Sequence, residues 1–198
     1  MEQTTKKILA IIPARGGSKR FPRKNVRLLA GQPLIAHTIR HALESAHINK
    51  VVVSTDDQEI AEVSKIAGVQ IIERPKELAG DESPTHQAVE HVLGHLAETE
   101  QYVPDVVVLL QPTSPLRIAQ DIDQAMGLFL KNTCESVVSI SESGKPNGAV
   151  YISTPAHLET YKSFYTKQML HYVMPKERSV DIDQEEDFRL AESLIQKS

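Results

Sequence analysis

Short apolar segments alternate with longer amphipathic ones along this sequence, and this alternation restricts the fold more than any other feature. Residues 7–14, 51–53 and 106–110 are apolar at nearly every position, which is typical of strands covered on both faces. Further strands are predicted over residues 69–72, 136–140, 149–152 and 179–182. Helices are predicted over residues 33–45, 57–67, 86–99, 119–130 and 184–196. This order predicts an α/β domain with three αβα layers around a mostly parallel, mixed sheet.

The chain has the size of one domain. Its 198 residues contain no internal repeat and no linker-like stretch, so we expect a single domain over residues 1–198. The one cysteine, Cys134, excludes an intramolecular disulfide and a cysteine-rich zinc site. No apolar run reaches the ~20 residues of a membrane span, and the first apolar segment is too short for a secretory signal. We therefore expect a cytoplasmic protein without membrane contact.

Positive charge is concentrated in one short stretch, although the net charge of the chain is −4. Six cations and no acid lie between residues 15 and 27, namely Arg15, Lys19, Arg20, Arg23, Lys24 and Arg27. A single cationic loop on an acidic protein is suited to a small anionic ligand rather than to a long polyanion such as nucleic acid. We therefore expect no nucleic-acid partner.

The cationic loop follows the first predicted strand, at the edge where parallel sheets bind their ligands. Gly16 and Gly17 let the backbone approach a phosphate closely, and successive N–H groups there can form an anion nest. The cations would neutralise a triphosphate and the charge that develops during its transfer. The loop matches neither the Walker A sequence nor the dinucleotide fingerprint. It therefore predicts a phosphate-binding loop of another kind, with a solvated basic turn as the alternative.

Two carboxylates alternate with an apolar residue near the end of the sequence. Asp181 and Asp183 are two positions apart in a predicted strand, so both face one side while Ile182 faces the core. Two such oxygen ligands suit Mg²⁺, which takes one or two carboxylates together with phosphates and water. Asp183 is also followed by Glu186 at the spacing of a helix capping box. A metal site and a helix cap are both consistent with this pattern.

A polar loop over residues 110–117 follows the most apolar predicted strand, which we expect at the centre of the sheet. Pro112 and Pro115 reduce the entropy that the loop loses on ordering. The amide of Gln111 can both donate to and accept from a sugar hydroxyl or carboxylate. A purely structural turn is the alternative for this loop.

Seven segments spread over nearly the whole chain carry a family resemblance. They are residues 12–19 (IPARGGSK), 22–25 (PRKN), 53–56 (VSTD), 74–79 (RPKELA), 110–117 (LQPTSPLR), 147–152 (NGAVYI) and 179–183 (SVDID). In this order they resemble the acylneuraminate cytidylyltransferase family, which comprises the CMP-sialic acid synthetases and their legionaminate and pseudaminate relatives. The resemblance implies a Rossmann-like nucleotide-diphospho-sugar transferase fold. It also implies transfer of CMP from CTP to the anomeric hydroxyl of a nine-carbon keto acid sugar, with release of pyrophosphate.

The resemblance assigns roles to particular residues. It implies Mg²⁺ (or Mn²⁺) as the cofactor, bound by Asp181 and Asp183. Lys24 and Arg15 would be the catalytic cations. The implied nucleotide-binding residues are Ala14, Arg15, Ser18, Lys24, Asn25, Arg74 and Thr85. The implied sugar-binding residues are Gln111, Asn147, Tyr151 and Lys145.

One segment of the family is missing from this chain. Family members usually carry a longer stretch between the strand at 136–140 and Asn147, where this chain has only residues 141–146. That insert normally forms a dimerisation arm and supplies a basic contact to the sugar carboxylate, so the family's homodimer depends on a part that is absent here. Two alternatives to a nonulosonate cytidylyltransferase therefore stay open: a nucleotidyltransferase for another sugar, and a non-catalytic CTP-binding paralogue.

Overall fold

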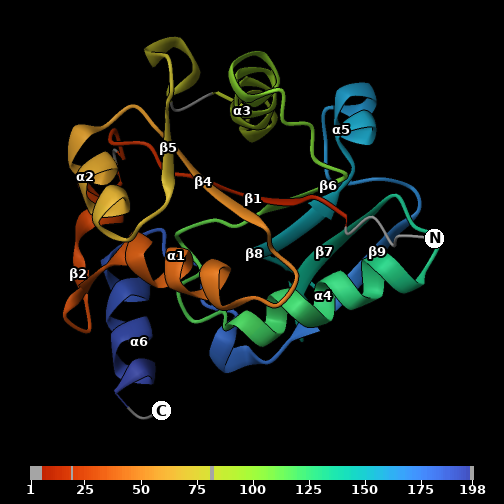
Figure 1. The fold of residues 1–198 in the computed structure, drawn as a ribbon. Helices are drawn as coiled ribbons and strands as arrows, with labels where there is room; N and C mark the ends of the chain where they lie inside the picture. The colour runs from red at the N-terminus through yellow and green to blue at the C-terminus, as the bar shows by residue number, and fades with distance from the viewer. Residues whose placement is uncertain (1–5, 19, 81–82, 197–198) are drawn as a thin grey trace.

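A computed structural model describes residues 6–18, 20–80 and 83–196 and has a seven-stranded sheet at its centre (Figure 1). The strands lie in the order β5-β4-β1-β6-β8-β7-β9. Their bounds are β1 Ile8–Pro13, β4 Lys50–Thr55, β5 Gln70–Glu73, β6 Val106–Leu109, β7 Ser136–Ser141, β8 Pro146–Ser153 and β9 Met169–Met174. The middle position of β6 confirms the prediction that the most apolar strand is central.

Most neighbouring strands in the sheet are parallel. β1 pairs in parallel with β4 and β6, as do β4 with β5 and β7 with β9. β8 runs antiparallel to both β6 and β7. The predicted mixed, mostly parallel sheet is therefore confirmed. A separate two-stranded ribbon pairs β2 (Leu28–Leu29) with β3 (Gln32–Pro33).

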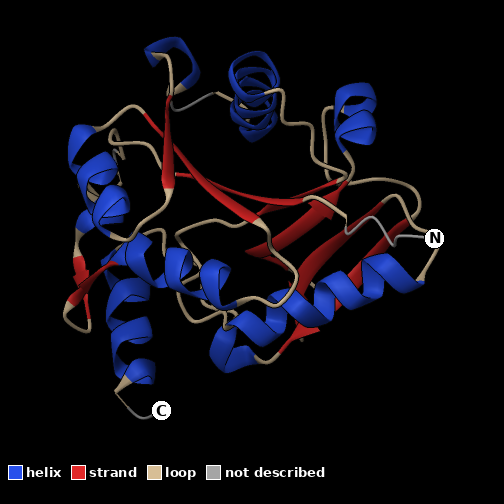
Figure 2. Ribbon diagram, in the orientation of Figure 1, coloured by secondary structure: helices blue, strands red, loops and turns tan. Residues whose placement is uncertain are grey.

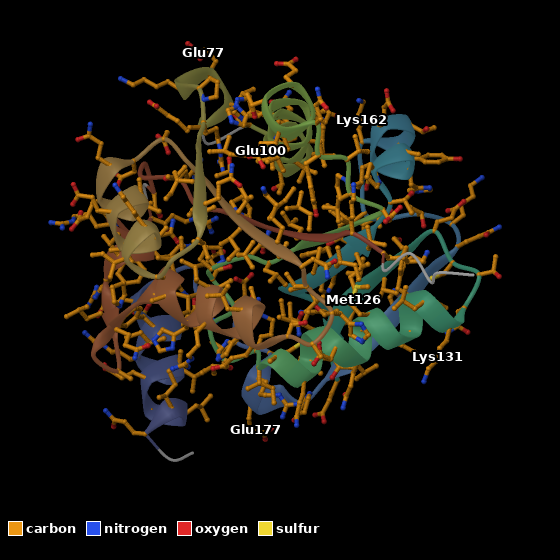
Figure 3. The ribbon with its side chains drawn as sticks, in the orientation of Figure 1. Glu77, Glu100, Met126, Lys131, Lys162 and Glu177 are labelled. Carbon is orange, nitrogen blue, oxygen red and sulfur yellow. The ribbon has the colours of Figure 1, made fainter. Side chains whose placement is uncertain are left out.

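Helices cover both faces of the sheet (Figure 2). Their bounds are α1 Leu34–Glu44, α2 Gln58–Ile66, α3 Thr85–Glu100, α4 Ala119–Lys131, α5 Pro155–Tyr161 and α6 Glu185–Ile195. α1, α2 and α4 pack on one face through apolar residues such as Ile60 and Met126. α3 and α5 pack on the other through Val92 and Leu158. Figure 3 shows Met126 on the sheet side of α4 and Lys131 at the far end of the same helix. The three predicted layers are confirmed.

The second half of the chain differs from the prediction in three elements. Residues 179–182 form no strand but an irregular segment between a 3₁₀ turn (η3, Lys176–Arg178) and α6. Ile182 is buried there as predicted. The alternation of polar and apolar residues that suggested a strand therefore reflects the burial of this one side chain and not pairing with another strand. The edge strand β9 and the short helix α5 were not predicted. β9 buries few of its side chains, which leaves only a weak periodic signal.

The last helix, α6, packs against the cationic loop. Phe21 of the loop and Phe188 of α6 belong to a third apolar cluster, and their rings meet edge to face at 5.5 Å. The guanidinium of Arg27 lies over both rings, 4.8 and 4.7 Å from their centroids. Arg27 also makes two hydrogen bonds to the Glu185 carboxylate at the start of α6. This stacked and paired arginine fixes the helix to the loop.

β7 and β8 are joined by a tight turn over residues 142–145. The Ser141 N–H donates to the Lys145 carbonyl, and the Gly144 N–H donates to the Ser141 carbonyl, both at 2.8 Å. Gly144 has a φ of +80°, a backbone conformation that residues other than glycine rarely adopt. The chain therefore closes a compact hairpin where the family resemblance would place a longer insert. Within the described ranges, no helix is both long enough and apolar enough to cross a membrane.

Candidate active site

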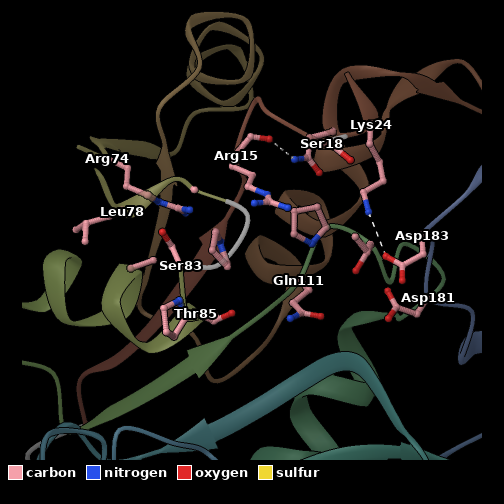
Figure 4. A pocket seen from close by; sticks show the side chains of 17 residues that line it. Arg15, Ser18, Lys24, Arg74, Leu78, Ser83, Thr85, Gln111, Asp181 and Asp183 are labelled. Carbon is pink, nitrogen blue, oxygen red and sulfur yellow. Dashed lines mark hydrogen bonds and ion pairs between the residues drawn. The ribbon is translucent and has the colours of Figure 1, made fainter. Parts of the chain in front are cut away.

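A cavity of about 380 Å³ opens at the edge of the sheet where β1, β5 and β6 end (Figure 4). Its walls come from the loops that follow these strands, from the start of α3 and from the segment that precedes α6. The lining residues are Pro13, Arg15, Ser18, Lys24, Asn25, Arg74, Leu78, Gly80, Ser83, Pro84, Thr85, Ala88, Gln111, Pro112, Thr113, Asp181 and Asp183. Ligands of parallel α/β sheets bind at this edge. Most of the predicted site residues therefore meet in one place.

The cationic loop forms one wall of the cavity. Arg15, Ser18 and Lys24 line this wall, and their side chains are drawn in Figure 4. Asn25 is only 7% exposed, and its Nδ2 donates to the Arg15 carbonyl at 3.0 Å. This bond joins the beginning and the end of the loop, so Arg15 and Lys24 are held on the same side. Two cations and a hydroxyl on one wall form a suitable surface for phosphate groups.

Other cations of the loop are paired within the protein. Arg23 forms an ion pair with Glu59 of α2, and Arg27 forms one with Glu185 of α6. Neither arginine lines the cavity. Lys19 lies outside the described residues. The high local charge that the sequence suggested is thus partly balanced by acids that are distant in the sequence.

Gly16 lets the loop pack closely against α2, and its N–H group is already hydrogen-bonded within the protein. The Gly16 N–H donates to Asp56 Oδ1 at 3.0 Å, and the Ser18 N–H donates to the Gly16 carbonyl at 3.0 Å. The anion-nest prediction is therefore wrong for these two amides. A Cβ at Gly16 would collide with the side chain of Asp57, which caps the start of α2. Glycine is required here by packing against α2.

Two carboxylates form the wall next to Lys24. Asp181 and Asp183 both line the cavity, and Ile182 between them is fully buried, as the alternation predicts. Lys24 Nζ donates to the Ile182 carbonyl at 2.7 Å and lies 3.7 Å from Asp183 Oδ1. Arg20 NH1 lies 3.3 Å from Asp183 Oδ2. Residues separated by most of the chain thus bring cations and carboxylates to one point.

The helix-cap alternative for Asp183 is wrong. α6 begins at Glu185, and the residue before it is Gln184 rather than Asp183. The carboxylate that caps this helix belongs to Asp187, whose Oδ2 accepts from the N–H groups of Asp183 and Gln184, each at 3.0 Å. Glu186 is not part of this arrangement. The Asp183 carboxylate is therefore not used as a cap and faces the cavity.

Burial shifts the proton affinity of groups on both walls. It lowers the pKa of Lys24, against the attraction of Asp183 and Asp181, because the ammonium loses hydration in the cavity wall. It raises the pKa of Asp181, although the residue still has surface open to the cavity. The Thr113 side chain lowers this pKa, and the negative charge of Asp183 raises it further. A divalent cation placed between the two carboxylates would relieve their repulsion.

The carboxylate pair fits a hard divalent cation that brings further ligands with it. No group of three or more histidine, cysteine, aspartate or glutamate side chains suited to a metal occurs among the described residues. Mg²⁺ commonly uses one or two protein carboxylates and completes its octahedron with phosphate oxygens and water. Asp181 and Asp183 would supply such ligands beside a phosphate-binding wall.

The other end of the cavity is formed by Arg74, Leu78, Ser83 and Thr85 (Figure 4). Arg74 is only 6% exposed, and Ser54 holds it through two hydrogen bonds. Arg74 Nε donates to Ser54 Oγ at 3.1 Å, and NH2 donates to the Ser54 carbonyl at 2.7 Å. The same carbonyl accepts from the Ala14 N–H at 3.0 Å. Ser54 thus positions two predicted nucleotide-binding residues.

The predicted sugar-binding residues occupy different environments. Gln111 lines the cavity, and a Cβ on Gly148 of β8 would lie 2.5 Å from its Oε1. Tyr151, also in β8, is 8% exposed. Burial raises the pKa of Tyr151, and its hydrogen bond with Tyr165 and the negative charge of Asp181 raise it further. Tyr151 is therefore near the carboxylate wall without lining the cavity. Lys145 is exposed in the β7–β8 turn.

Asn147 is engaged inside the protein. It is 2% exposed, and its Oδ1 accepts from Ser139 Oγ at 2.6 Å. Its Nδ2 donates to Ser179 Oγ at 3.1 Å and lies 3.3 Å from Met174 Sδ. The Asn147 side chain therefore links β7 and β8 to the segment that leads to Asp181. Contact between Asn147 and a sugar stays a prediction.

Sequence reasoning missed several residues that build this cavity. Leu78, Ser83 and Thr113 line it, and Ser54 and Asp56 support it from behind. Thr113 lies in the polar loop that the sequence singled out, and Ser54 and Asp56 lie in a segment of the family resemblance. Leu78 lies in another of these segments, residues 74–79, whereas Ser83 comes from a loop whose composition indicated only irregular structure.

The sequence pattern of the cytidylyltransferase family matches residues 9–195. The chain belongs to this family. It is 34% identical to an N-acylneuraminate cytidylyltransferase of Escherichia coli, over 96% of this chain and 52% of that protein, so it spans about half of that relative. It is 37% identical to a CMP-N,N'-diacetyllegionaminic acid synthase of Legionella pneumophila, over 96% of this chain and 97% of the relative.

Two further relatives bear on the fold and on the missing insert. The solved structure of a CMP:2-keto-3-deoxy-manno-octonic acid synthetase in complex with CTP superposes on this chain with a TM-score of 0.75 at 16% identity. The match covers 96% of this chain and 99% of that chain, which establishes the Rossmann-like fold. A pseudaminic acid cytidylyltransferase of Campylobacter jejuni is 34% identical over 89% of this chain and 72% of that protein.

Alignment lengths separate these relatives. The alignment with the Legionella protein extends over 226 residues, more than the 198 of this chain, so that relative has segments without a counterpart here. The alignment with the Campylobacter protein extends over 177 residues and covers 89% of this chain and 72% of that protein, so the aligned part contains almost no position that this chain lacks.

Proposed function

We propose that this cytidylyltransferase transfers CMP from CTP to the anomeric hydroxyl of a nonulosonate sugar and releases pyrophosphate. The observation that carries the proposal is the meeting of a cationic wall and a carboxylate wall in one cavity, with Lys24 Nζ 3.7 Å from Asp183 Oδ1. Three relatives named above act on neuraminate, legionaminate and pseudaminate derivatives.

The nucleotide would lie along the cavity with its triphosphate against the cationic loop. Arg15, Ser18, Lys24 and Asn25 would hold the phosphates, because two of them carry positive charge and all line this wall. The cytidine would extend toward Arg74 and Thr85, with the Ala14 backbone beside it. Arg74 is suited to reading a base edge, because Ser54 fixes the orientation of its planar guanidinium.

The transfer exchanges a phosphoanhydride bond for a phosphoester bond. The anomeric oxygen of the sugar forms a bond to the α-phosphorus of CTP, the bond from that phosphorus to the pyrophosphate oxygen breaks, and the sugar hydroxyl releases its proton to solvent. Negative charge grows on the leaving pyrophosphate. Lys24 and Arg15 would stabilise this charge from fixed positions, which is where most of the rate enhancement in such transfers arises.

Asp181 and Asp183 would hold Mg²⁺ or Mn²⁺ at the carboxylate wall. The bound ion would supply charge neutralisation for the phosphate oxygens. Lys24 lies between the two carboxylates and the other cations of the loop, so its ammonium would contact both the phosphates and Asp183. Gln111 and Tyr151 would face the acceptor, next to this point.

Pseudaminic acid is the acceptor that one specific observation favours. The alignment with the Campylobacter pseudaminic acid relative covers 89% of this chain almost without gaps in it, whereas the alignment with the Legionella relative contains many positions that this chain lacks. An acceptor site built without the longer segment would therefore be shared with the former relative. Lys145, in the turn that replaces that segment, would be the basic residue nearest to the sugar carboxylate.

Pyrophosphate release tests the proposal. The purified protein is assayed with Mg²⁺ and each of the four nucleoside triphosphates, against N-acetylneuraminate, legionaminate, pseudaminate and Kdo. We expect release with CTP and a nonulosonate, and strongest release with pseudaminate. Lys24→Met should abolish it, whereas Lys50→Met, which removes a lysine at the opposite edge of the sheet, should not.

Two outcomes favour the alternatives instead. Pyrophosphate release with CTP and a sugar other than a nonulosonate, but with no nonulosonate, would indicate a nucleotidyltransferase for another class of acceptor. Binding of CTP without release for any acceptor would indicate a non-catalytic CTP-binding paralogue. Binding and release are measured on the same preparation, so a misfolded sample is recognised by the loss of both.

A further inference from the structure

The segment that carries Asp181 and Asp183 has no pairing strand, so single contacts must fix its position. At its far end the Ile182 N–H donates to the Thr113 carbonyl at 2.8 Å, and the Ile182 side chain is fully buried. In its middle Ser179 bonds to Asn147. At its near end stands Arg178, the last residue of η3.

Arg178 is held by a buried carboxylate. Its Nε donates to Asp121 Oδ2 at 3.0 Å and its NH2 donates to Oδ1 at 2.9 Å, which is a two-bond, planar pairing. Asp121 is 1% exposed, and the Ile118 N–H donates to its Oδ2 at 3.0 Å. The Tyr172 hydroxyl lies 2.9 Å from its Oδ1. Paired guanidinium and carboxylate groups of this kind are both strong and strongly oriented.

Asp121 connects the two sides of the cavity, although it does not line it. It lies in the first turn of α4, directly after the loop that places Gln111 and Thr113 in the cavity wall. Through Arg178 it also holds the segment that places Asp181 in the adjoining part of the wall, beside Thr113. A shift of this carboxylate would therefore move the two parts relative to each other.

We propose that Asp121 and Arg178 are positioning residues that fix Asp181 and Asp183 against the Gln111 loop, and so set the affinity of the cavity for its divalent cation. The inference rests on the proposed function, because it takes the two carboxylates as the cation ligands. Without the pair, the segment would lose its anchor at Arg178 and would depend on its remaining contacts, such as those of Ser179 and Ile182, so the two carboxylates would be held less firmly.

A purely structural pair would behave differently from a positioning pair. A buried carboxylate that loses its partner destabilises a protein wherever it lies. Thermal stability alone therefore does not separate the two roles. Affinity for the cation does, because it depends on the placement of Asp181 and Asp183 and not on the overall stability of the fold.

Binding of Mn²⁺ in the presence of CTP, followed by electron paramagnetic resonance without any acceptor, is the direct test. We expect Arg178→Gln to weaken Mn²⁺ binding about ten-fold, which is typical for loss of a group that orients metal ligands. Binding of CTP in the absence of metal should stay unchanged. The matched control is Lys50→Gln, which breaks the Lys50–Glu100 ion pair at the opposite edge of the sheet and should leave Mn²⁺ affinity unchanged.

A second variant keeps the test decisive if Arg178→Gln folds poorly. Asp121→Asn/Arg178→Gln removes the unpaired buried charge together with its partner. Because the two residues act as one unit, Mn²⁺ binding in this double variant should be about ten-fold weaker than in the wild type, the same loss that Arg178→Gln causes. Wild-type Mn²⁺ affinity in the folded variants would overturn the positioning role. Wild-type protein that binds no Mn²⁺ with CTP would instead overturn the proposed function.

Discussion

Gly148→Ala should damage acceptor use with little effect on the nucleotide. Gly148 lies on β8 with a φ of +72°, and a Cβ there would lie 2.5 Å from Gln111 Oε1 and 3.0 Å from Ser114 Oγ. The Ser114 hydroxyl is fixed by its hydrogen bond to the Asn147 carbonyl at 2.7 Å, so it cannot give way freely. Gln111 must therefore move away from its place in the cavity wall.

The size of the effect follows from the contacts that Gln111 would lose. Two neutral hydrogen bonds to the acceptor contribute about 1–3 kcal/mol together. At 1.36 kcal/mol for each factor of ten, this corresponds to roughly a 5- to 150-fold fall in kcat/KM for the acceptor. The left-handed backbone adds about 1–2 kcal/mol of lost stability, which does not depend on the acceptor.

Gly144→Ala is the control for the backbone contribution. Gly144 has a φ of +80° in the adjoining turn, and a Cβ there would meet nothing within 4 Å. Both variants should lose the backbone contribution in thermal unfolding, with a larger loss for Gly148→Ala because of its close contacts, whereas only Gly148→Ala should lose kcat/KM for the acceptor in the pyrophosphate assay. Equal acceptor kinetics in the two variants would refute the placement of Gln111 at the acceptor.

Two further changes test other parts of the site, and a third tests a buried histidine of α1. Lys24→Met should lower turnover by at least about 100-fold at unchanged fold, and near-normal pyrophosphate release would exclude Lys24 from the chemistry. Ser54→Ala should raise KM for CTP and reduce the preference for CTP over UTP without lowering kcat, because it loosens Arg74; an unchanged preference contradicts this. Burial lowers the pKa of His41 to about 3, so below pH ~6.5 the unfolded chain binds a proton that the folded chain does not. The free energy of unfolding should therefore fall by about a few kcal/mol as the pH is lowered toward the folded-state pKa. His41→Gln should flatten this acid loss in thermal unfolding, whereas the exposed His171→Gln should keep it.

The sequence alone was sufficient for the layers of the fold and for the edge that carries the cavity. Continuous apolar segments such as the one at β6 have few alternatives to a buried strand, and the residues after parallel strands must lie at one edge. The segment around Ile182 shows the limit of this reasoning. Burial of one residue between two polar ones gives the same pattern in an irregular segment as in a strand.

The roles of single polar side chains depended on partners that are distant in the sequence. Arg27 appeared to be one of several phosphate-binding cations, yet Glu185 pairs with it across nearly the whole chain. The resemblance assigns Asn147 to the sugar, which stays a prediction, and the structure adds Ser139 and Ser179 as partners of its amide. Such pairings have no local signal, because they arise only when the fold brings the segments together.

The third apolar cluster has a consequence for the order in which the protein becomes functional. It unites Phe21 with Ile182 and Phe188, whereas the seven-stranded sheet is complete at Met174. A ribosome delivers the chain from its amino terminus, and early parts can fold before later ones exist. A nascent chain can therefore assemble its sheet while the cationic loop still lacks the helix that supports it and the carboxylates that face it. The cavity proposed to hold the nucleotide is therefore complete only once α6 has been translated.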